Sequence, residues 1–488
     1  MIANSVRSFA MSRFALSIFC ILMSTALLRA DRPNFLFIFA DDQCFQTINA
    51  LGNEEVETPN LDKLARSGVT FDHTYNMGGW NGAICVASRT MLNTGRFIWN
   101  ANEIHPHLAN EVAEDRFWAK MLGKAGYETY FSGKWHVGKD SVCQAAFDHA
   151  RHVRPGMPNQ TPTGYNRPFK GKPDAWSPFD KSFDGFWKGG KHWSEVLADD
   201  AVDYLDQSSQ RDNPFFMYLA FNAPHDPRQA PKEYVDKYPL DKIAVPESFL
   251  PEYPYKDEMG CSAKLRDEKL APFPRTEYAV KVHRQEYYAI ITHMDAQIGR
   301  ILEALDKTGK RDNTYIIFTA DHGLSVGHHG LIGKQNQYDH SIRVPFIVCG
   351  PELEAGKRVS ASIYLQDVVP TTLELADIEK PEHVEFNSLV PLLRGQTNKH
   401  TYDAIYGAYM MLQRSITSEK FKLIVYPKAK RVRLFDLSKD PLEQNDLADD
   451  DAHQATKQRL IERLLKLQTE MHDPLNLRPM LSKLKKAA

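Results

Sequence analysis

The chain lacks a strong charge bias, a paired-cysteine motif and any long hydrophobic run beyond its N-terminus. Over 488 residues, 60 Lys and Arg nearly balance 62 Asp and Glu, which gives a formal net charge of -2. Such a chain has no overall field that would attract nucleic acid or an anionic membrane. We therefore expect no nucleic-acid partner, and any affinity for an anionic ligand must come from a local basic site.

Cysteine spacing excludes a common class of metal site. None of the 6 cysteines forms a Cys-x-x-Cys pair, so a zinc site of the usual spacing is not expected. Cys20 lies in the N-terminal apolar run. The others are Cys44, Cys85, Cys143, Cys261 and Cys349. The spacing leaves their disulfide pairing open.

The N-terminus has the pattern of a secretory signal. Arg7 and Arg13 precede an apolar run over residues 14–28, and small residues follow. The run, about 15 residues long, is shorter than the roughly 20 residues that span a bilayer as a helix. We expect residues 1–30 to be a cleaved signal peptide, with export to the periplasm or the extracellular space and no stable membrane anchor. An uncleaved anchor is the alternative.

Apolar runs of strand length alternate with helical patterns along most of the chain. The strand-length runs cover residues 34–40, 214–221, 314–319 and 344–348, and helical patterns cover residues 58–65, 196–205 and 284–305. Continuous apolar runs suit strands that are buried on both faces of a parallel sheet. The alternation predicts an α/β fold, with a large, mostly parallel central sheet flanked by helices, over a catalytic domain at residues 31–395.

The pattern changes near residue 400. Residues 422–426 and 431–437 read as antiparallel strands joined by a turn, and residues 452–471 as an amphipathic helix. We expect a smaller C-terminal α+β domain over residues 396–488.

Acidic residues follow two of the predicted strands directly. Asp41 and Asp42 come after the run at residues 34–40, and Asp321 with His322 follows the run at residues 314–319. Ligands of open α/β sheets bind at the carboxyl ends of the strands. Three carboxylates gathered there would repel one another unless a cation neutralised them, and oxygen ligands favour a hard ion such as Ca²⁺ or Mg²⁺. The alternative is that each pair is a solvated turn.

The most informative segment surrounds Cys85, which by itself would read as a buried structural cysteine. The segment and three later ones are Cys85-Val86-Ala87-Ser88-Arg89 with Thr94-Gly95-Arg96, Gly133-Lys134-Trp135-His136, Ala223-Pro224-His225 and Gly333-Lys334-Gln335. With the acidic pairs, these motifs resemble, in the same order, those of the formylglycine-dependent sulfatases of the alkaline phosphatase superfamily. The resemblance covers nearly the whole chain after residue 30.

The resemblance implies the fold, the cofactor and the metal. It implies an alkaline-phosphatase-like sheet and oxidation of Cys85 to formylglycine by a formylglycine-generating maturation enzyme. The hydrated aldehyde would then be the nucleophile that attacks sulfur. The implied metal ligands, for Ca²⁺ with Mg²⁺ possible, are Asp41, Asp42, Cys85, Asp321 and His322. His322 is the less secure ligand, because many family members have Asn there.

It also implies roles for five further residues. Arg89, about one helical turn from residue 85, would donate a hydrogen bond to the hydrated aldehyde. Lys134 and Lys334 would hold the sulfate oxygens as point charges. His136 would take a proton from residue 85, and His225 would be the general acid for the leaving alcohol. Position 87 is Ala where Pro is commoner in the family.

The substrate is less specified. Two Pro-, Gly- and aromatic-rich insertions, residues 151–185 and 226–278, are expected to shape the pocket. With export, they favour a sulfated carbohydrate as substrate. Candidate specificity residues are Trp80, His105, His107, His192, Trp193, Arg228 and Met410. The alternatives are a phosphodiesterase or phosphonate monoester hydrolase of the same superfamily, and a non-catalytic protein that binds sulfated glycans through an unmodified Cys85. The sugar, the sulfate position, exo or endo action and the oligomeric state stay open.

Overall fold

The computed structural model describes residues 32–158 and 161–485. The expected signal peptide at residues 1–30 lies outside the described residues. No helix within them is long and apolar enough to cross a membrane.

A nine-stranded mixed sheet forms the centre of the molecule, with the strand order β10-β2-β9-β7-β1-β6-β4-β5 and β8 paired to β2. Its strands are β1 (Asn34–Ala40), β2 (Val69–Tyr75), β4 (Glu128–Lys134), β5 (His149–Arg154), β6 (Phe215–Ala220), β7 (Thr314–Ala320), β8 (Arg343–Val344), β9 (Phe346–Cys349) and β10 (Lys357–Tyr364). The β1–β6, β1–β7, β4–β6, β4–β5 and β2–β10 pairs are parallel. The predicted strand at residues 344–348 is divided into β8 and β9 at Pro345, which has no N–H to donate.

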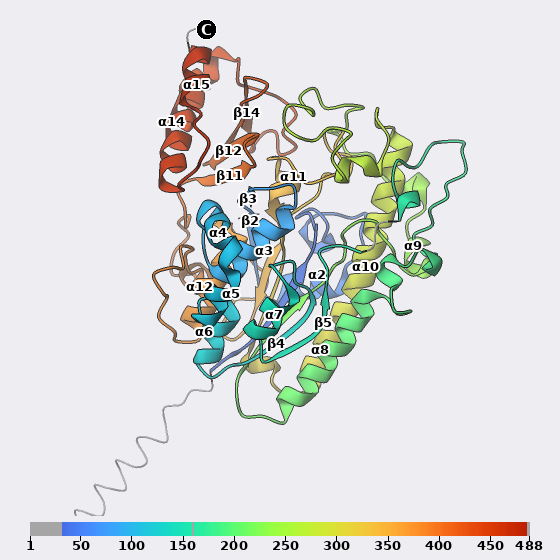
Figure 1. Ribbon diagram of the computed structural model, residues 1–488, viewed down its shortest axis with the longest axis vertical. Helices are drawn as coiled ribbons and strands as arrows, with labels where there is room; N and C mark the ends of the chain where they lie inside the picture. Colours follow the sequence, from blue (N-terminus) through green and yellow to red (C-terminus); the bar gives the residue numbers. More distant parts are fainter. Residues whose placement is uncertain (1–31, 159–160, 486–488) are drawn as a thin grey trace, which may run out of the picture.

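Helices cover both faces of the sheet, as Figure 1 shows. The helices of the described residues are α2 (Pro59–Ser67), α3 (Ile84–Thr94), α4 (Ile98–Ile104), α5 (Leu108–Ala113), α6 (Trp118–Lys124), α7 (Asp140–Ala146), α8 (Trp193–Ser209), α9 (Lys232–Val235), α10 (Glu277–Lys307), α11 (Asp339–Ile342), α12 (Val368–Leu375), α13 (Val390–Leu393), α14 (Gln454–Glu470) and α15 (Arg478–Lys485), of which α14 packs on the second sheet described below. In one group α2, α8 and α9 pack on α10, and in the other α3 packs on α4 and α6. The predicted α/β fold with a mostly parallel sheet flanked by helices is confirmed.

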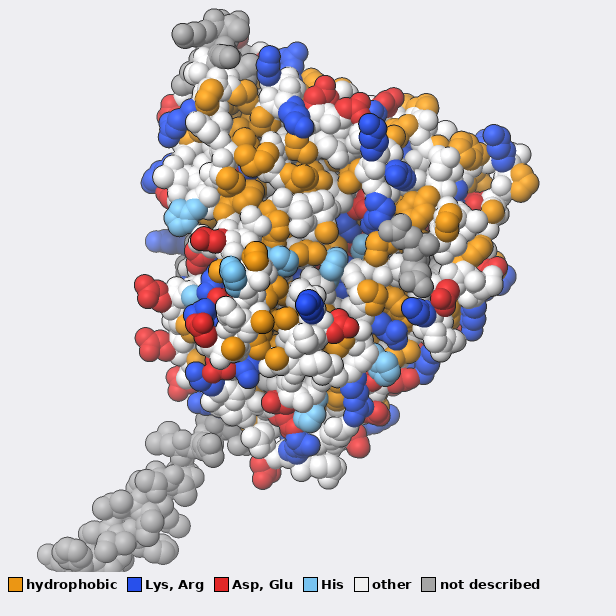
Figure 2. Space-filling view, in the orientation of Figure 1, with side chains coloured by type: hydrophobic (Ala, Val, Ile, Leu, Met, Phe, Trp, Pro, Cys, Tyr) orange, Lys and Arg blue, Asp and Glu red, His pale blue; other side chains and the backbone are white. Residues whose placement is uncertain are grey.

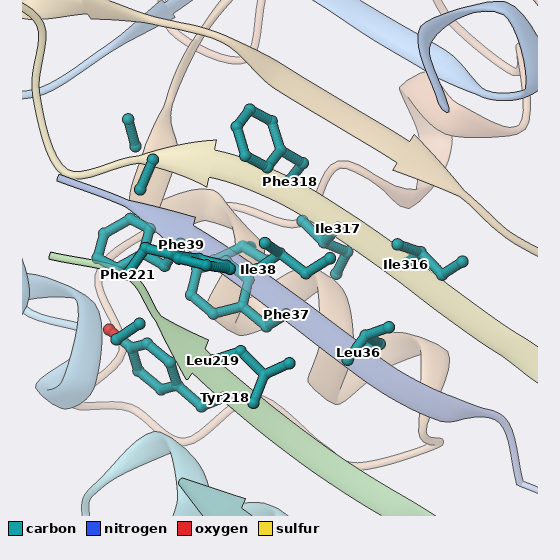
Figure 3. Packing of buried hydrophobic residues seen from close by; sticks show 14 of the residues in the cluster. Leu36, Phe37, Ile38, Phe39, Tyr218, Leu219, Phe221, Ile316, Ile317 and Phe318 are labelled. Carbon is teal, nitrogen blue, oxygen red and sulfur yellow. The ribbon is translucent and has the colours of Figure 1, made fainter. Parts of the chain in front are cut away.

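The core follows from the apolar run that forms β1. Its seven residues are all buried, because parallel neighbours lie on both sides and helices lie above and below. Figure 3 shows Phe37 of β1 beside Tyr218 of β6, with their ring centroids 5.0 Å apart. Trp118 of α6 packs against Phe37 from the helix layer, and their ring centroids are also 5.0 Å apart. This packing holds the carboxyl end of β1 rigidly in place.

A second, five-stranded sheet has the order β14-β13-β12-β11-β3. Its strands are β3 (Gly78–Gly79), β11 (Ile405–Tyr409), β12 (Gln413–Ser418), β13 (Phe421–Tyr426) and β14 (Arg431–Asp436). The antiparallel pair β13–β14 and helix α14 lie where the sequence pattern predicts them. At Gly78 (φ +91°) a Cβ atom would clash with the carbonyl oxygen of Ala408, so only glycine allows the contact between β3 and β11. This contact joins the second sheet to the segment that leads into α3.

Candidate active site

Two neighbouring strand ends bring the acidic residues together. The paired strands β1 and β7 end in register at Ala40 and Ala320, so Asp41 and Asp42 emerge beside Asp321. The backbone N–H of Asp42 donates to Asp321 Oδ1 over 3.1 Å. All three carboxylates are 0% exposed. They are therefore not solvated turn residues, which was the alternative interpretation of each pair.

Helix α3 presents Cys85 to these carboxylates. Cys85 lies in the first turn of the helix, and its Sγ is 3.2 Å from His322 Nε2. Ser88, one turn further on, donates from Oγ to the carbonyl of Asp321 over 2.8 Å. The helix is thus fixed against the end of β7, with residue 85 directed into the cluster.

Arg89 supports the carboxylates. Its Nε donates to Asp321 Oδ2 over 3.0 Å, and its guanidinium lies 3.8 Å from Asp41 Oδ1. It also donates to the backbone carbonyl of Lys134 over 2.9 Å. The hydrogen bond that Arg89 would donate to a hydrated aldehyde at position 85 stays a prediction, because residue 85 is a thiol in this structure. Arg89 orients Asp321 and joins the ends of β7 and β4.

Two buried lysines flank the cluster. Lys134, the last residue of β4, pairs with Asp41, and Lys334 Nζ lies 2.8 Å from both carboxylate oxygens of Asp42. Lys334 Nζ is also 3.6 Å from Cys85 Sγ. Their side chains are at most 2% exposed. Two cations, one paired with each of Asp41 and Asp42, thus lie close enough to residue 85 to lower the pKa of its thiol.

Two histidines reach the same point from other segments. His136, which follows β4, lies near enough to Cys85 to lower the pKa of its thiol. His225, which follows β6, points Nε2 to within 3.2 Å of Lys334 Nζ. Burial lowers the pKa of His136, so the ring is neutral at neutral pH and can accept a proton.

The charged groups of the site strongly shift the pKa values of Cys85 and His322. Burial alone would raise the pKa of Cys85, but Lys134, Lys334 and His322 bring it well below its usual range. Burial also opposes protonation of His322, but Asp321 and Asp42 raise its pKa to about 9. Perturbed pKa values of this kind are concentrated at functional sites.

The residues present fit a hard divalent cation. Ligand atoms of Asp41, Cys85, Asp321 and His322 all lie within 4.8 Å of one another and are buried. Asp41 Oδ1 is buried without a hydrogen-bond partner. Burial and the nearby charge of Asp321 raise the pKa of Asp41, and a cation would offset both effects. Asp42 falls in a second such group, with Cys85 and His225.

The candidate specificity residues divide into two groups. His192, Trp193 and Arg228 are 0%, 4% and 1% exposed, so they are too deeply buried to contact a substrate from the surface, which corrects the expectation for them. Those with accessible surface are Trp80, His105, His107 and Met410. The ring centroids of Trp80 and His105 are 5.6 Å apart.

Figure 2 shows acidic and basic side chains interspersed over the visible face, in keeping with the net charge.

Several residues around the site were not predicted. They are Asn76, Asp226, Arg266, Asp267 and Gln335, which hydrogen-bond predicted site residues or their direct partners. Asp226 directly follows one motif and Gln335 is the last residue of another, although neither was assigned a role, and that position was the available signal. Arg266 and Asp267 lie in an insertion with no motif, so nothing in the sequence pointed to them.

The fold and the site define a hydrolase with an alkaline-phosphatase-like sheet, and comparisons with known proteins give the family. The Sulfatase family model matches residues 33–378. A second family model, N-sulphoglucosamine sulphohydrolase, C-terminal, matches residues 327–470. The chain belongs to the sulfatase family, which confirms the resemblance seen in the motifs and the expected enzyme class.

Named relatives agree. The chain is 28% identical over 468 residues to the uncharacterized sulfatase YidJ of Escherichia coli, covering 91% of this chain and 88% of the relative. It is 28% identical over 447 residues to an arylsulfatase of Clostridium perfringens, with 85% and 90% covered. It is 26% identical over 506 residues to the N-acetylglucosamine-6-O-sulfatase of Bacteroides thetaiotaomicron, with 89% and 86% covered.

Solved structures share the fold. One, in complex with its substrate D-glucosamine-2-N,6-O-disulfate, has a TM-score of 0.70 at 22% identity and covers 91% of this chain and 99% of its own. The phosphonate monoester hydrolase of Agrobacterium radiobacter has the same TM-score and identity, with 90% and 96% covered. At this identity the likeness shows the fold alone, and the fold is common to sulfate and phosphonate ester hydrolases.

Proposed function

We propose that this sulfatase is an exported enzyme that hydrolyses sulfate esters of a carbohydrate, using a formylglycine made from Cys85 and a divalent cation, Ca²⁺ or Mg²⁺. The observation that carries the proposal is the buried cluster around Cys85, in which two lysines and carboxylates from two strand ends gather. Export rests on the N-terminal pattern alone.

The relatives support a carbohydrate substrate. One similar protein is an N-acetylglucosamine-6-O-sulfatase. Another, 25% identical over 469 residues, is an ulvan-active sulfatase of Formosa agariphila. The names of both relatives refer to carbohydrate substrates, and the irregular insertions beside the site suit a substrate larger than an aryl ester. The sugar and the position of its sulfate group remain to be found by screening sulfated mono- and oligosaccharides.

The cofactors would supply the nucleophile and the charge. A formylglycine at position 85 would provide a hydrated aldehyde whose hydroxyl attacks sulfur. A cation held by Asp41, Asp42, Asp321, His322 and residue 85 would neutralise charge on the sulfate. A maturation enzyme that oxidises Cys85 is therefore a required partner.

The chain's own residues would do the rest. Lys134 and Lys334, both close to the cluster, would bind the sulfate oxygens as fixed point charges. His136, close to residue 85 and kept neutral by burial, would accept a proton there. His225 Nε2, beside Lys334, would donate a proton to the leaving oxygen. Arg89 would keep the Asp321 carboxylate oriented.

A phosphonate or phosphate ester hydrolase is the second candidate. The phosphonate monoester hydrolase with the same fold favours it, and lysines beside a cation would also bind phosphate. Parallel assays with aryl sulfates and aryl phosphonate monoesters separate the two functions, with Cys85→Ala as the inactive control. We expect faster turnover of the sulfate, and faster turnover of the phosphonate would overturn the proposal.

The modification is tested separately. Intact-mass analysis of the Cys85 peptide, purified from the native host, measures whether sulfur has been replaced by oxygen. A peptide with a wholly unmodified thiol would contradict the proposed nucleophile, whatever ester the protein turns over.

A further inference from the structure

One arginine from the second insertion links two of the proposed catalytic segments. Arg266 NH1 donates to Asp226 Oδ2 over 2.5 Å, and its NH2 lies 2.5 Å from Asp267 Oδ1. The same NH1 is 3.3 Å from the hydroxyl of Tyr165, in the first insertion. The two carboxylates are at most 4% exposed, whereas the arginine side chain keeps 25% of its surface accessible. A guanidinium holds two acceptors in a fixed planar geometry, whereas an ammonium is a compact point charge whose donors rotate.

The first carboxylate belongs to the residue that orients His225. The Nδ1 of His225 is 2.6 Å from the backbone carbonyl of Asp226. A carbonyl only accepts hydrogen bonds, so Nδ1 carries a proton in either protonation state, and Nε2, which carries the transferable proton when the ring is an imidazolium, faces the site. The Asp226 carboxylate lies 3.8 Å from the same Nδ1. The backbone that fixes the imidazole is thus held through this side chain, which Arg266 binds.

The second carboxylate fixes the segment that carries Lys334. Asp267 Oδ2 accepts a hydrogen bond from Gln335 Nε2 over 2.7 Å and lies 3.8 Å from Lys334 Nζ. Gln335 Oε1 accepts in turn from the backbone N–H of Lys334 over 3.0 Å. Asp267 therefore anchors both the backbone and the side chain of this segment.

Charge makes the link necessary. Although burial opposes ionisation, Arg266 and His225 hold the pKa of Asp226 well below its usual range, so the carboxylate stays charged. The nearby Arg228 also lowers the pKa of Asp226 but makes no ion pair within the described residues. Without Arg266, the two buried carboxylates would lose the cation that binds both of them, which favours their separation.

From these contacts we infer that Arg266 is a positioning residue, which holds His225 and Lys334 at the distance that leaving-group protonation and sulfate binding require. The inference rests on the proposed function, in which His225 is the general acid. It assigns a role to the insertion at residues 226–278 that no motif carries. The alternative is that Arg266 only stabilises the loop.

The experiment compares leaving groups. Arg266→Met keeps the length of the side chain and removes its charge. We expect kcat/KM to fall by about 100-fold for aryl sulfates with poor leaving groups and by less than about 10-fold for activated nitrophenyl sulfates, because a good leaving group needs little protonation. The lysine of Arg266→Lys can reach one carboxylate only, so its kcat/KM values should lie between those of Arg266→Met and the wild type. Equal losses for all leaving groups would overturn the inference in favour of a structural role.

A matched control comes from α10. Arg284 is 13% exposed and pairs with Glu55 over 3.1 Å, away from the predicted site residues. Arg284→Met should leave the leaving-group dependence unchanged and alter kcat/KM by no more than about 3-fold. A shift in the dependence equal to that of Arg266→Met would show that the effect is not specific to the link.

A second measurement separates this inference from the proposed function. Calorimetric binding of inorganic sulfate to Cys85→Ala, in buffer containing Ca²⁺, needs no turnover. We expect the added Arg266→Met change to weaken sulfate binding about 10-fold through Lys334, and unchanged binding would count against the link to Lys334. If the wild type cleaves only phosphonates, the proposed function fails and the leaving-group comparison is made with aryl phosphonates.

Discussion

Removing the proposed divalent cation should destabilise the protein by about the free energy that its binding contributes. Asp41 Oδ1 is buried without a hydrogen-bond partner beside the equally buried Asp321. An unpaired buried polar group costs about 1–3 kcal/mol, and a charged one costs more. Binding at 100 times Kd contributes about 2.7 kcal/mol. With about 2.1 cal/mol/K per residue over about 450 residues, the unfolding temperature should fall by about 3 °C on chelation.

The assay is thermal unfolding followed by circular dichroism, in EDTA and then with excess Ca²⁺ or Mg²⁺. Asp321→Asn should lose the cation-dependent shift, since it removes a proposed ligand. Asp295→Asn is the control: this buried aspartate binds backbone N–H groups at the start of α2, and its variant should keep the shift. A wild type with the same unfolding temperature in EDTA and in excess cation would refute the reasoning, as would an undiminished shift in Asp321→Asn.

Three further predictions concern the nucleophile, the acid sensitivity and the core. Cys85→Ala should abolish aryl sulfate turnover while its circular dichroism spectrum stays native, and residual turnover above about 1% would contradict the proposed nucleophile. Burial lowers the pKa of His329 to about 4 in the folded protein, so on acidification the unfolded chain binds a proton at this residue at a higher pH than the folded protein does. The free energy of unfolding should therefore fall by on the order of 3 kcal/mol as pH drops from about 6.5 to 4. In urea titrations the fall should be smaller for His329→Gln. An equal pH slope in the variant would refute this. Phe37→Ala should cost about 3–5 kcal/mol in the same assay, and a cost under about 1 kcal/mol would mean that the core rearranges.

The central sheet could be predicted because its strands are buried on both faces. β1 and β7 appear in the sequence as unbroken apolar runs, and an acidic residue marks where each one ends. Their parallel pairing, in register at Ala40 and Ala320, then puts Asp41 beside Asp321. Here the local sequence pattern and the long-range packing agree, so the acidic residues of the site could be predicted from the local pattern alone.

The second sheet could be predicted only in part. β13 and β14 form a hairpin whose alternation and turn are visible locally. β3 is only two glycines long, and it pairs with a strand more than 300 residues away in the chain. A two-residue strand has no periodicity, and its partner is chosen by tertiary packing. Local patterns therefore could not assign it.

The solvent exposure of a side chain could not be predicted from its closeness to a motif in the sequence. Arg228 lies three residues after His225, yet it is 1% exposed and packs with its guanidinium 5.2 Å from the ring of Tyr287. Arg266 is far from every motif, yet its two carboxylate partners adjoin His225 and Lys334. Because the insertion at residues 226–278 folds back to the site, a residue far from every motif in the sequence can contact the motif segments in space. The motif residues can thus stay fixed while substitutions in residues 226–278 change how the leaving group is handled.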